Sequence, residues 1–224
     1  MNSREFLDEF SSYAKKGIQE LGLEISEETF ERLKRYFEAL REFSEPLGLT
    51  ALKDPRDYAA KHLLDSLAVV PHLPEGPLLD LGTGAGLPGM VIKIVEPERE
   101  VWLVDARKKP ISFLTYVAGL LGLKDLHVVR ATVGKRDPLP RGYFSGVISR
   151  AVTDLKTLWD LAEPLLAPKG ELLAMKGPGV SEEIPKIQER GLRAEVIPLK
   201  VPLLHGTRNL VKITRHEDHS PETR

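Results

Sequence analysis

The chain has 224 residues, of which 42% are hydrophobic and 29% charged, with a net charge of −1 and no cysteine. This composition predicts a globular protein with a sizeable core, and it excludes disulfides, thiolate zinc centres and cysteine nucleophiles. No apolar run reaches the roughly 20 residues of a membrane span, and the start MNSREFLDEF is too charged for a secretory signal. We therefore expect a cytoplasmic monomer, away from membranes, and we predict no metal site.

Helices are predicted at the start of the chain. Two precede residue 45, and the second covers 26–43, where Ser26 is suited to cap it and Phe30, Leu33 and Phe37 recur on one face. A third helix follows Pro55, a residue suited to a first helical turn. Residues 1–72 are therefore predicted to be a helical extension that packs on the remainder of the chain.

From Pro77 onward, short β-rich runs alternate with helical segments. Strands are expected at 77–82, 100–106, 126–131, 143–149 and 171–177, and helices after Pro88 and over 110–123, 153–166 and 181–189. This alternation predicts an α/β core, residues 73–215, with a mainly parallel sheet covered by helices. The runs 192–199 and 208–214 have no helix between them and should pair antiparallel, before a polar tail over 216–224.

The stretch LLDLGTGAGLPG, residues 78–89, is a glycine-rich turn between an expected strand and an expected helix. Such a turn lets a ligand approach the backbone and the free N–H groups of the helix. Asp80 followed by Gly82, Gly84 and Gly86 resembles the first motif of Rossmann-like class I methyltransferases that use S-adenosylmethionine. The same run also satisfies the dinucleotide pattern GxGxxG, which alone is weak evidence, and a purely structural turn is a further alternative.

Charge favours S-adenosylmethionine as the cofactor. A pyrophosphate is disfavoured beside a carboxylate, whereas Asp80 can bind the amino group or face the sulfonium of S-adenosylmethionine. Asp105 ends the next strand and can bind a ribose, which both cofactors carry. We expect cofactor contacts from Asp80, Gly82, Thr83, Gly84, Gly86 and Asp105.

Residue types that the sequence lacks at the expected site narrow the choice of methyl acceptor. Carbon-5 of a pyrimidine needs a cysteine thiolate, and ISRAV, residues 148–152, lacks the proline and aromatic residue typical of enzymes that methylate a base amine. A hydroxyl needs a base, which leaves a ribose 2′-O alternative through the set Lys61, Asp154, Lys176 and Glu195. The N7 atom of guanine offers a lone pair without deprotonation, so methylation at N7 is compatible with a site that has no evident nucleophile.

Basic residues follow the ends of the expected strands, where ligands of open α/β sheets bind. They are Arg107, Lys108 and Lys109 after the second strand, Lys135 and Arg136 after the third, Arg150 after the fourth and Lys176 after the fifth. Because the net charge is close to zero, this local patch indicates a polyanionic substrate. We predict RNA contacts from Lys108, Lys109, Lys135, Arg136 and Lys176, although lysines are also common on any surface loop.

Six stretches together resemble the small-subunit ribosomal RNA guanine-N7 methyltransferases, also called the RsmG or glucose-inhibited division protein B family. They are 49–67, 78–89, 113–114, 146–151, 175–178 and 208–211. The resemblance implies methylation of one guanine in 16S rRNA, and cofactor contacts from Gly82, Leu87, Val133, Gly134 and Arg150. The chain departs from the family pattern at Gly48, where Asn is common, and at Gly134, where an acid is common.

The segment 49–67 admits two interpretations. Lys61, His62, Asp65 and Ser66 could form a functional patch for cofactor or RNA, and with the resemblance we predict Lys61 and His62, together with Arg150, as catalytic residues. Alternatively, Lys61 and Asp65 form an i,i+4 ion pair and His62 only packs the helix. The predicted enzyme is thus an rRNA guanine-N7 methyltransferase; the alternatives are a ribose 2′-O or small-molecule methyltransferase and a non-catalytic, cofactor-dependent RNA-binding regulator.

Overall fold

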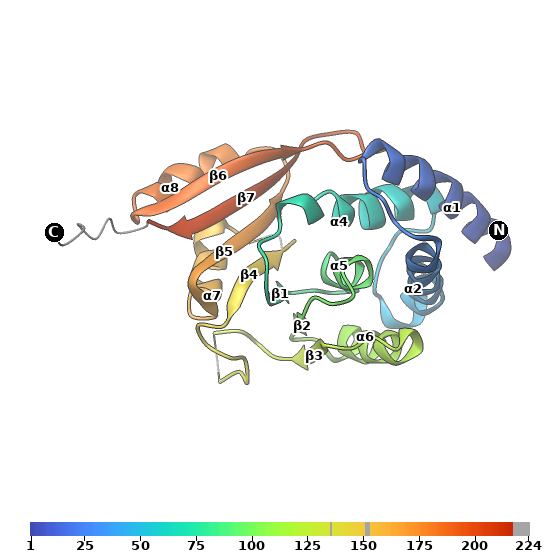
Figure 1. Cartoon of the computed structure of the whole chain (residues 1–224), viewed down its shortest axis with the longest axis horizontal. Coiled ribbons are helices and arrows are strands. Elements are labelled where there is room, and N and C mark those ends of the chain that lie inside the picture. The colour runs from blue at the N-terminus through green and yellow to red at the C-terminus, as the bar shows by residue number, and fades with distance from the viewer. Residues whose placement is uncertain (135, 151–152, 217–224) are drawn as a thin grey trace.

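A seven-stranded sheet lies at the centre of the computed structural model, which describes residues 1–134, 136–150 and 153–216 (Figure 1). The strand order is β3-β2-β1-β4-β5-β7-β6. The strands are β1 (Leu78–Leu81), β2 (Val101–Asp105), β3 (Leu126–Arg130), β4 (Phe144–Ser149), β5 (Leu166–Lys176), β6 (Leu192–Leu199) and β7 (Arg208–Arg215). Strands β1 to β5 pair in parallel and β7 runs antiparallel to both β5 and β6, which confirms the predicted α/β sheet with a reversed last strand.

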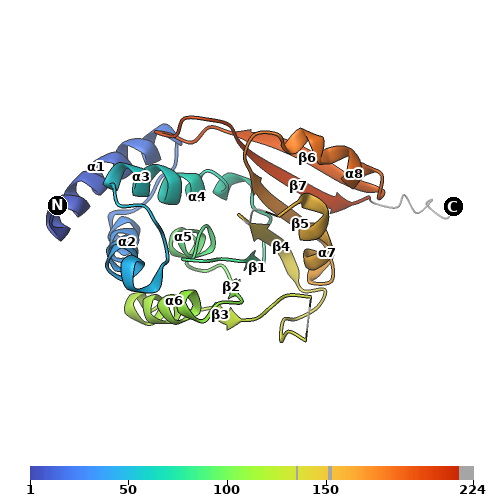
Figure 2. The same ribbon diagram turned by 180° about the vertical axis from the view of Figure 1, so that it is seen from behind.

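Helices cover both faces of the sheet (Figures 1 and 2). One face carries α5 (Gly89–Val95), α6 (Lys108–Leu121) and a continuous helix built from α3 (Pro55–Asp57), η1 (Tyr58–Leu64) and α4 (Asp65–Leu67), with α1 (Ser3–Glu20) and α2 (Glu27–Leu47) outside them. The other face carries α7 (Leu155–Ala162) and α8 (Ile184–Gln188). Two short 3-10 turns, η2 (Val70–His72) and η3 (Val180–Glu182), complete the described elements.

Local sequence explains where α2 begins and ends. The Ser26 side chain accepts a hydrogen bond from the backbone N–H of Thr29, as the cap prediction required. Gly48 ends the helix with φ of +63°, a left-handed conformation that glycine and asparagine adopt more readily than other residues. The glycine at this position, noted as a departure from the family pattern, therefore suits the backbone conformation that ends α2.

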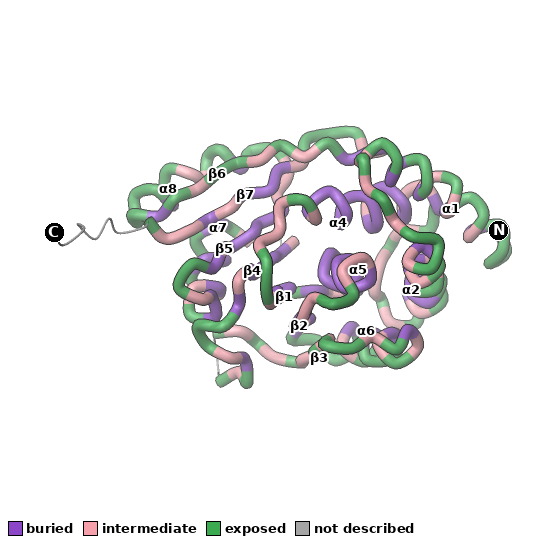
Figure 3. Tube along the Cα trace, viewed as in Figure 1, coloured by how far each residue is buried: buried purple, intermediate pink, exposed green. Residues whose placement is uncertain are grey.

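One apolar core crosses the predicted boundary between extension and sheet domain. Phe6 and Phe37 from the first two helices are fully buried together with Leu63, Met90 and Leu114. Figure 3 shows the corresponding buried band through α4 and α5. The extension is thus packed on the core, while the boundary at residue 72 remains a prediction; of the tail 216–224, only His216 lies within the described residues.

The helix predicted over 153–166 is shorter in the structure. Helix α7 ends at Ala162, and β5 begins at Leu166, earlier than the expected strand at 171–177. Pro164 contributes to the difference, because it lacks the N–H group that would continue the helical hydrogen bonds after Glu163. Among the described helices, none combines the length and apolar character needed to cross a bilayer.

Candidate functional site

The glycine-rich turn joins β1 to α5 and is held by hydrogen bonds to its neighbours. The N–H groups of Gly82 and Thr83 both donate to the Val104 carbonyl on β2, at 2.9 and 3.0 Å. Asp80 accepts from the Gly89 N–H at 2.7 Å and from the Thr83 hydroxyl at 2.8 Å, both through Oδ2. The aspartate before the glycines therefore closes the turn onto the first residue of α5.

Gly86 occupies the crowded side of the turn. Its φ is +98°, and a Cβ there would lie 2.7 Å from Leu114 Cδ2 and 2.8 Å from Met90 Cβ. The preceding carbonyl, that of Ala85, accepts a 2.7 Å hydrogen bond from the hydroxyl of Tyr36 on α2. The N-terminal extension thus contacts the turn directly, through a tyrosine that sequence reasoning did not single out.

Gly82 faces the open side of the same turn. Its φ is +72° and a Cβ there would meet nothing within 4 Å, so the backbone is accessible to a ligand. Beneath it, Asp80 is fully buried; burial raises its pKa to about 6, against the opposing hydrogen bonds from Thr83 and Gly89. Its Oδ1 atom is buried and has no hydrogen-bond partner among the described residues. Side-chain-free backbone beside a buried, half-satisfied carboxylate fits the methionine end of S-adenosylmethionine.

The structure modifies the prediction for Asp80. Its carboxylate is not open to the surface, because it is occupied with closing the turn. A direct contact with the cofactor's amino group therefore requires access to Oδ1 and stays a prediction.

Asp105, at the end of β2, lies beside the turn. Its Oδ2 accepts from the Gly84 N–H at 2.9 Å, and its two oxygens also accept from the backbone and guanidinium of Arg107. Burial alone would raise the pKa of Asp105, but the hydrogen bonds from Arg107 and Gly84 outweigh it, so the pKa is lowered. The ionised carboxylate thus lies against the β1–α5 turn, and its contact with the ribose of the cofactor stays a prediction.

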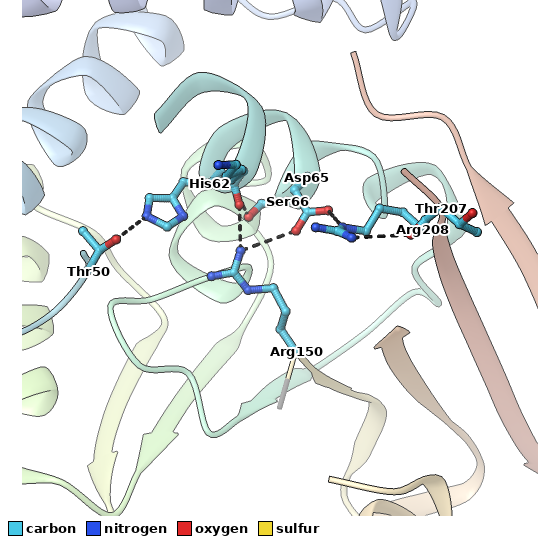
Figure 4. A network of polar contacts seen from close by, with 8 residues as sticks. Thr50, His62, Asp65, Ser66, Arg150, Thr207 and Arg208 are labelled. Carbon is cyan, nitrogen blue, oxygen red and sulfur yellow. Dashed lines mark hydrogen bonds and ion pairs between the residues drawn. The ribbon is translucent and has the colours of Figure 1, made fainter. Parts of the chain in front are cut away.

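Arg150 follows β4 and reaches across to the helix made of α3, η1 and α4 (Figure 4). Its Nη1 donates to the Lys61 carbonyl at 2.9 Å and lies 3.4 Å from Asp65 Oδ2. Arg208, the first residue of β7, binds the other oxygen of Asp65 through Nε at 3.3 Å. Asp65 therefore joins two arginines that are far apart in the sequence, and Arg208 is a site residue that only its place in the matching stretch 208–211 could have indicated.

The pair expected between Lys61 and Asp65 is not formed. Lys61 binds Asp57 at 3.0 Å, on the preceding turn, and its side chain is 43% exposed. Asp65 points inward to the two arginines instead; burial raises its pKa and their positive charges oppose that rise. Lys61 thus contributes its carbonyl to the Arg150 network, while its ammonium group stays at the surface.

His62 is buried within the same helix. Its Nε2 lies 2.9 Å from the Thr50 hydroxyl, and its Nδ1 is buried with no partner among the described residues. Burial, and then the nearby charge of Arg150, lower its pKa to about 4. The imidazole is therefore neutral at physiological pH, and Ser66 supports the same turn by donating to the His62 carbonyl at 2.6 Å.

The predicted RNA-binding residues divide into two groups. Lys108, Lys109 and Arg136 are exposed at the ends of β2 and β3, on the sheet edge that carries the turn. Lys176 is not available in the same way, because its side chain is 13% exposed and its ammonium binds the Thr153 carbonyl and Glu183. We therefore withdraw Lys176 as an RNA contact, and Lys135 lies outside the described residues.

Two further expectations concern loops near the cofactor turn. Val133 is partly buried against the apolar cluster beneath α7, and the Gly134 N–H donates to Asp137 at 3.2 Å, with φ of +85° at Gly134. Their predicted cofactor contacts remain predictions. The ribose 2′-O alternative loses support, since Asp154 caps α7 by accepting from Thr157 and Glu195 is exposed on β6. The described residues contain no group of three or more potential side-chain metal ligands.

Comparison with known proteins agrees with this geometry. The family model for rRNA small subunit methyltransferase G matches residues 29–211. A protein from Methylobacillus flagellatus named ribosomal RNA small subunit methyltransferase G is 40% identical to this chain, over 87% of this chain and 93% of its own length. A protein of the same name from Acinetobacter baumannii is 37% identical, over 92% of this chain and 98% of its own length.

Solved structures share the fold at lower identity. A SAM-dependent methyltransferase from Aquifex aeolicus matches with a TM-score of 0.54 at 20% identity, covering 76% of this chain and 98% of its own. A putative S-adenosyl-L-methionine-dependent methyltransferase from Methanococcus maripaludis also matches with a TM-score of 0.54. Its sequence identity is 15%, and the match covers 83% of this chain and 95% of its own.

Proposed function

The chain belongs to the rRNA small subunit methyltransferase G family, and from this premise we propose that it transfers the methyl group of S-adenosylmethionine to N7 of a guanine in 16S rRNA. The observation that carries the proposal is the family match over 29–211, because this range includes the cofactor turn, Asp105 and the Arg150 network together. Recognition of the family from six short stretches is thereby confirmed.

Each part of the site has a role in this reaction. The turn from Gly82 to Gly89 seats the methionine end of the cofactor, and Asp105 holds the ribose. Arg150, kept in place by the Lys61 carbonyl and Asp65, orients the incoming guanine or the cofactor at the reaction centre. The exposed cations of the sheet edge bind the phosphates of the RNA.

The chemistry needs little beyond positioning. When bound, S-adenosylmethionine supplies an electrophilic methyl group. Guanine N7 has a free lone pair at neutral pH, so no side chain has to remove a proton before the methyl transfer, and alignment of two bound reactants can lower a barrier by about 7–11 kcal/mol. The low pKa of His62 agrees with this, since it makes the imidazole a weak base that is neutral at physiological pH. We therefore assign His62 and Lys61 to shaping the site around Arg150.

We further propose that the protein acts as a monomer in the cytoplasm. The large hydrophobic side chains that are most exposed among the described residues belong to separate segments of the chain: Met1, Tyr116, Tyr143 and Val196. Such scattered residues are normal for a monomer surface.

The proposed activity is tested by incubating the protein with 16S rRNA, or with small ribosomal subunits, and labelled S-adenosylmethionine. Aniline cleavage then maps N7-methylguanine, and a new cut at one guanine is expected. Cofactor turnover on RNA without a new cut would refute the N7 assignment and leave the methyltransferase assignment in place. Binding of RNA without S-adenosylhomocysteine release would instead support a regulator, and turnover without RNA a small-molecule enzyme.

A further inference from the structure

All the acceptor positions of the Asp105 carboxylate are already used. Oδ1 accepts from the Arg107 backbone N–H at 2.9 Å and from Arg107 Nε at 3.0 Å. Oδ2 accepts from the Gly84 N–H at 2.9 Å and from Arg107 Nη2 at 3.1 Å. A carboxylate offers about four lone-pair sites, so these four bonds leave no place for a ribose hydroxyl.

The guanidinium is the partner of Asp105 that can leave. The two backbone N–H groups belong to the turns after β1 and β2 and are held by the fold. The Arg107 side chain, in contrast, is 65% exposed, while that of Asp105 is 6% exposed. Because the guanidinium is largely in contact with solvent, water screens its attraction to Asp105 and can take over its hydrogen bonds when it leaves. A ribose diol can therefore reach Asp105 by displacing the guanidinium alone.

The guanidinium also lies over the cofactor turn. A Cβ at Gly84 would have Arg107 Nη2 as its nearest described neighbour outside the adjoining residues, at 3.6 Å. The guanidinium therefore borders the turn, in van der Waals contact with the space beside Gly84. Arg107 immediately precedes α6, next to the exposed Lys108 and Lys109, so a released guanidinium stays at the mouth of the site. Its preferred new partner there is an RNA phosphate, which accepts a bidentate arginine contact.

We propose that cofactor binding displaces the Arg107 guanidinium from Asp105 and frees it to bind an RNA phosphate. Arg107 is then a positioning residue that couples the two substrates: it opposes cofactor binding in the absence of RNA and strengthens RNA binding once the cofactor is present. Linkage requires the reciprocal effect, so RNA must raise the affinity for the cofactor. The inference rests on the proposed function, because it takes Asp105 as the ribose partner.

The first test measures cofactor affinity by calorimetry without RNA. Arg107→Ala is expected to bind both S-adenosylmethionine and S-adenosylhomocysteine about two- to fivefold more tightly than the wild type, in line with the modest strength of an exposed ion pair. Lys108→Ala is the matched control, since it removes the same charge from the neighbouring position and no hydrogen bond of Asp105. Its cofactor affinity should equal that of the wild type.

The second test measures the salt dependence of binding to a 16S rRNA transcript, with and without S-adenosylhomocysteine. In the wild type, the cofactor should steepen the slope of log K against log salt concentration by about 0.7–0.9, the value for one additional phosphate contact. In Arg107→Ala the slope should not respond to the cofactor. Lys108→Ala should keep the response from a lower starting slope.

The outcomes separate this inference from the proposed function. A wild type that binds neither S-adenosylmethionine nor S-adenosylhomocysteine would overturn the proposed function itself. Normal wild-type binding with equal or weaker cofactor affinity in Arg107→Ala would overturn the displacement of the guanidinium. A wild-type salt slope that ignores the cofactor would overturn its transfer to RNA.

Discussion

Replacing Asp80 by asparagine should change how the stability of the protein depends on pH. Burial raises the pKa of Asp80 to about 6 from an ordinary value of 3.8, so the folded protein holds this proton more tightly than the unfolded chain does. The contribution of Asp80 to stability is fully present at pH values below its pKa in the unfolded chain, and it is lost as the pH rises through about 6. The difference between the folded and unfolded pKa values of Asp80 corresponds to about 3 kcal/mol.

His62 works in the opposite direction over nearly the same range. Folding lowers the pKa of His62 from 6.5 to about 4. Its contribution to stability is therefore present at pH values above its pKa in the unfolded chain, and it is lost as the pH falls toward 4. The two buried groups therefore oppose each other in the wild type. Asp80→Asn removes the Asp80 contribution and leaves that of His62 unopposed. The free energy of unfolding of this variant should therefore rise between about pH 4 and 6.5 by about 3 kcal/mol more than that of the wild type.

Urea unfolding followed by circular dichroism at several pH values measures this difference, with the slope against urea compared between variants. Any constant cost of burying the asparagine amide cancels, because only the change with pH is compared. His62→Gln is the complementary control and should show the opposite trend. A difference between Asp80→Asn and the wild type that stays flat across this range would refute the argument that burial, rather than hydrogen bonding, controls the Asp80 carboxyl.

Three further results are expected. Tyr36→Phe leaves the Ala85 carbonyl without its donor and should cost about 1–3 kcal/mol of stability and weaken cofactor binding. Tyr58→Phe also removes a buried hydroxyl, but one that is bonded to Ser44 and not to the turn, so this control should leave cofactor affinity unchanged in calorimetry. Gly86→Ala should destabilise the protein by about 2–5 kcal/mol in thermal unfolding, because its added Cβ would contact Leu114 and Met90 closely. Gly82→Ala places its Cβ in open space, so it should cost only about 1–2 kcal/mol and should mainly change cofactor affinity. Equal losses of stability in the two variants would contradict this reasoning. Arg150→Ala should remain folded and lose methyl transfer in the aniline assay, and full activity would remove Arg150 from the site.

Local sequence patterns were sufficient to predict much of the architecture. Alternating apolar runs and helical segments placed all the strands of the sheet, and the missing helix between 192–199 and 208–214 predicted their antiparallel pairing. The glycine turn with its preceding aspartate was recognisable because the whole motif lies within residues 78–89. The end of α2 was predicted less well, because the helix continues past the expected residue 43 to Leu47, before Gly48 in its left-handed conformation.

Contacts between distant segments had to await the tertiary structure. Asp65 meets Arg150 and Arg208 only because α4, β4 and β7 converge in space, so the choice of Asp57 over Asp65 as the partner of Lys61 could not be read from helical spacing. Lys176 likewise turns inward to Glu183.

The sequence by itself predicted the class of fold and the cofactor from short-range patterns and residue chemistry, and the kind of substrate from basic strand ends and the resemblance of six stretches to a known family. Only the tertiary structure decided which charged side chains pair with one another, since burial and the relative placement of strand ends control those choices. The hydroxyl of Tyr36 on the Ala85 carbonyl illustrates the difference: 49 positions separate the two residues, and folding brings them within 2.7 Å.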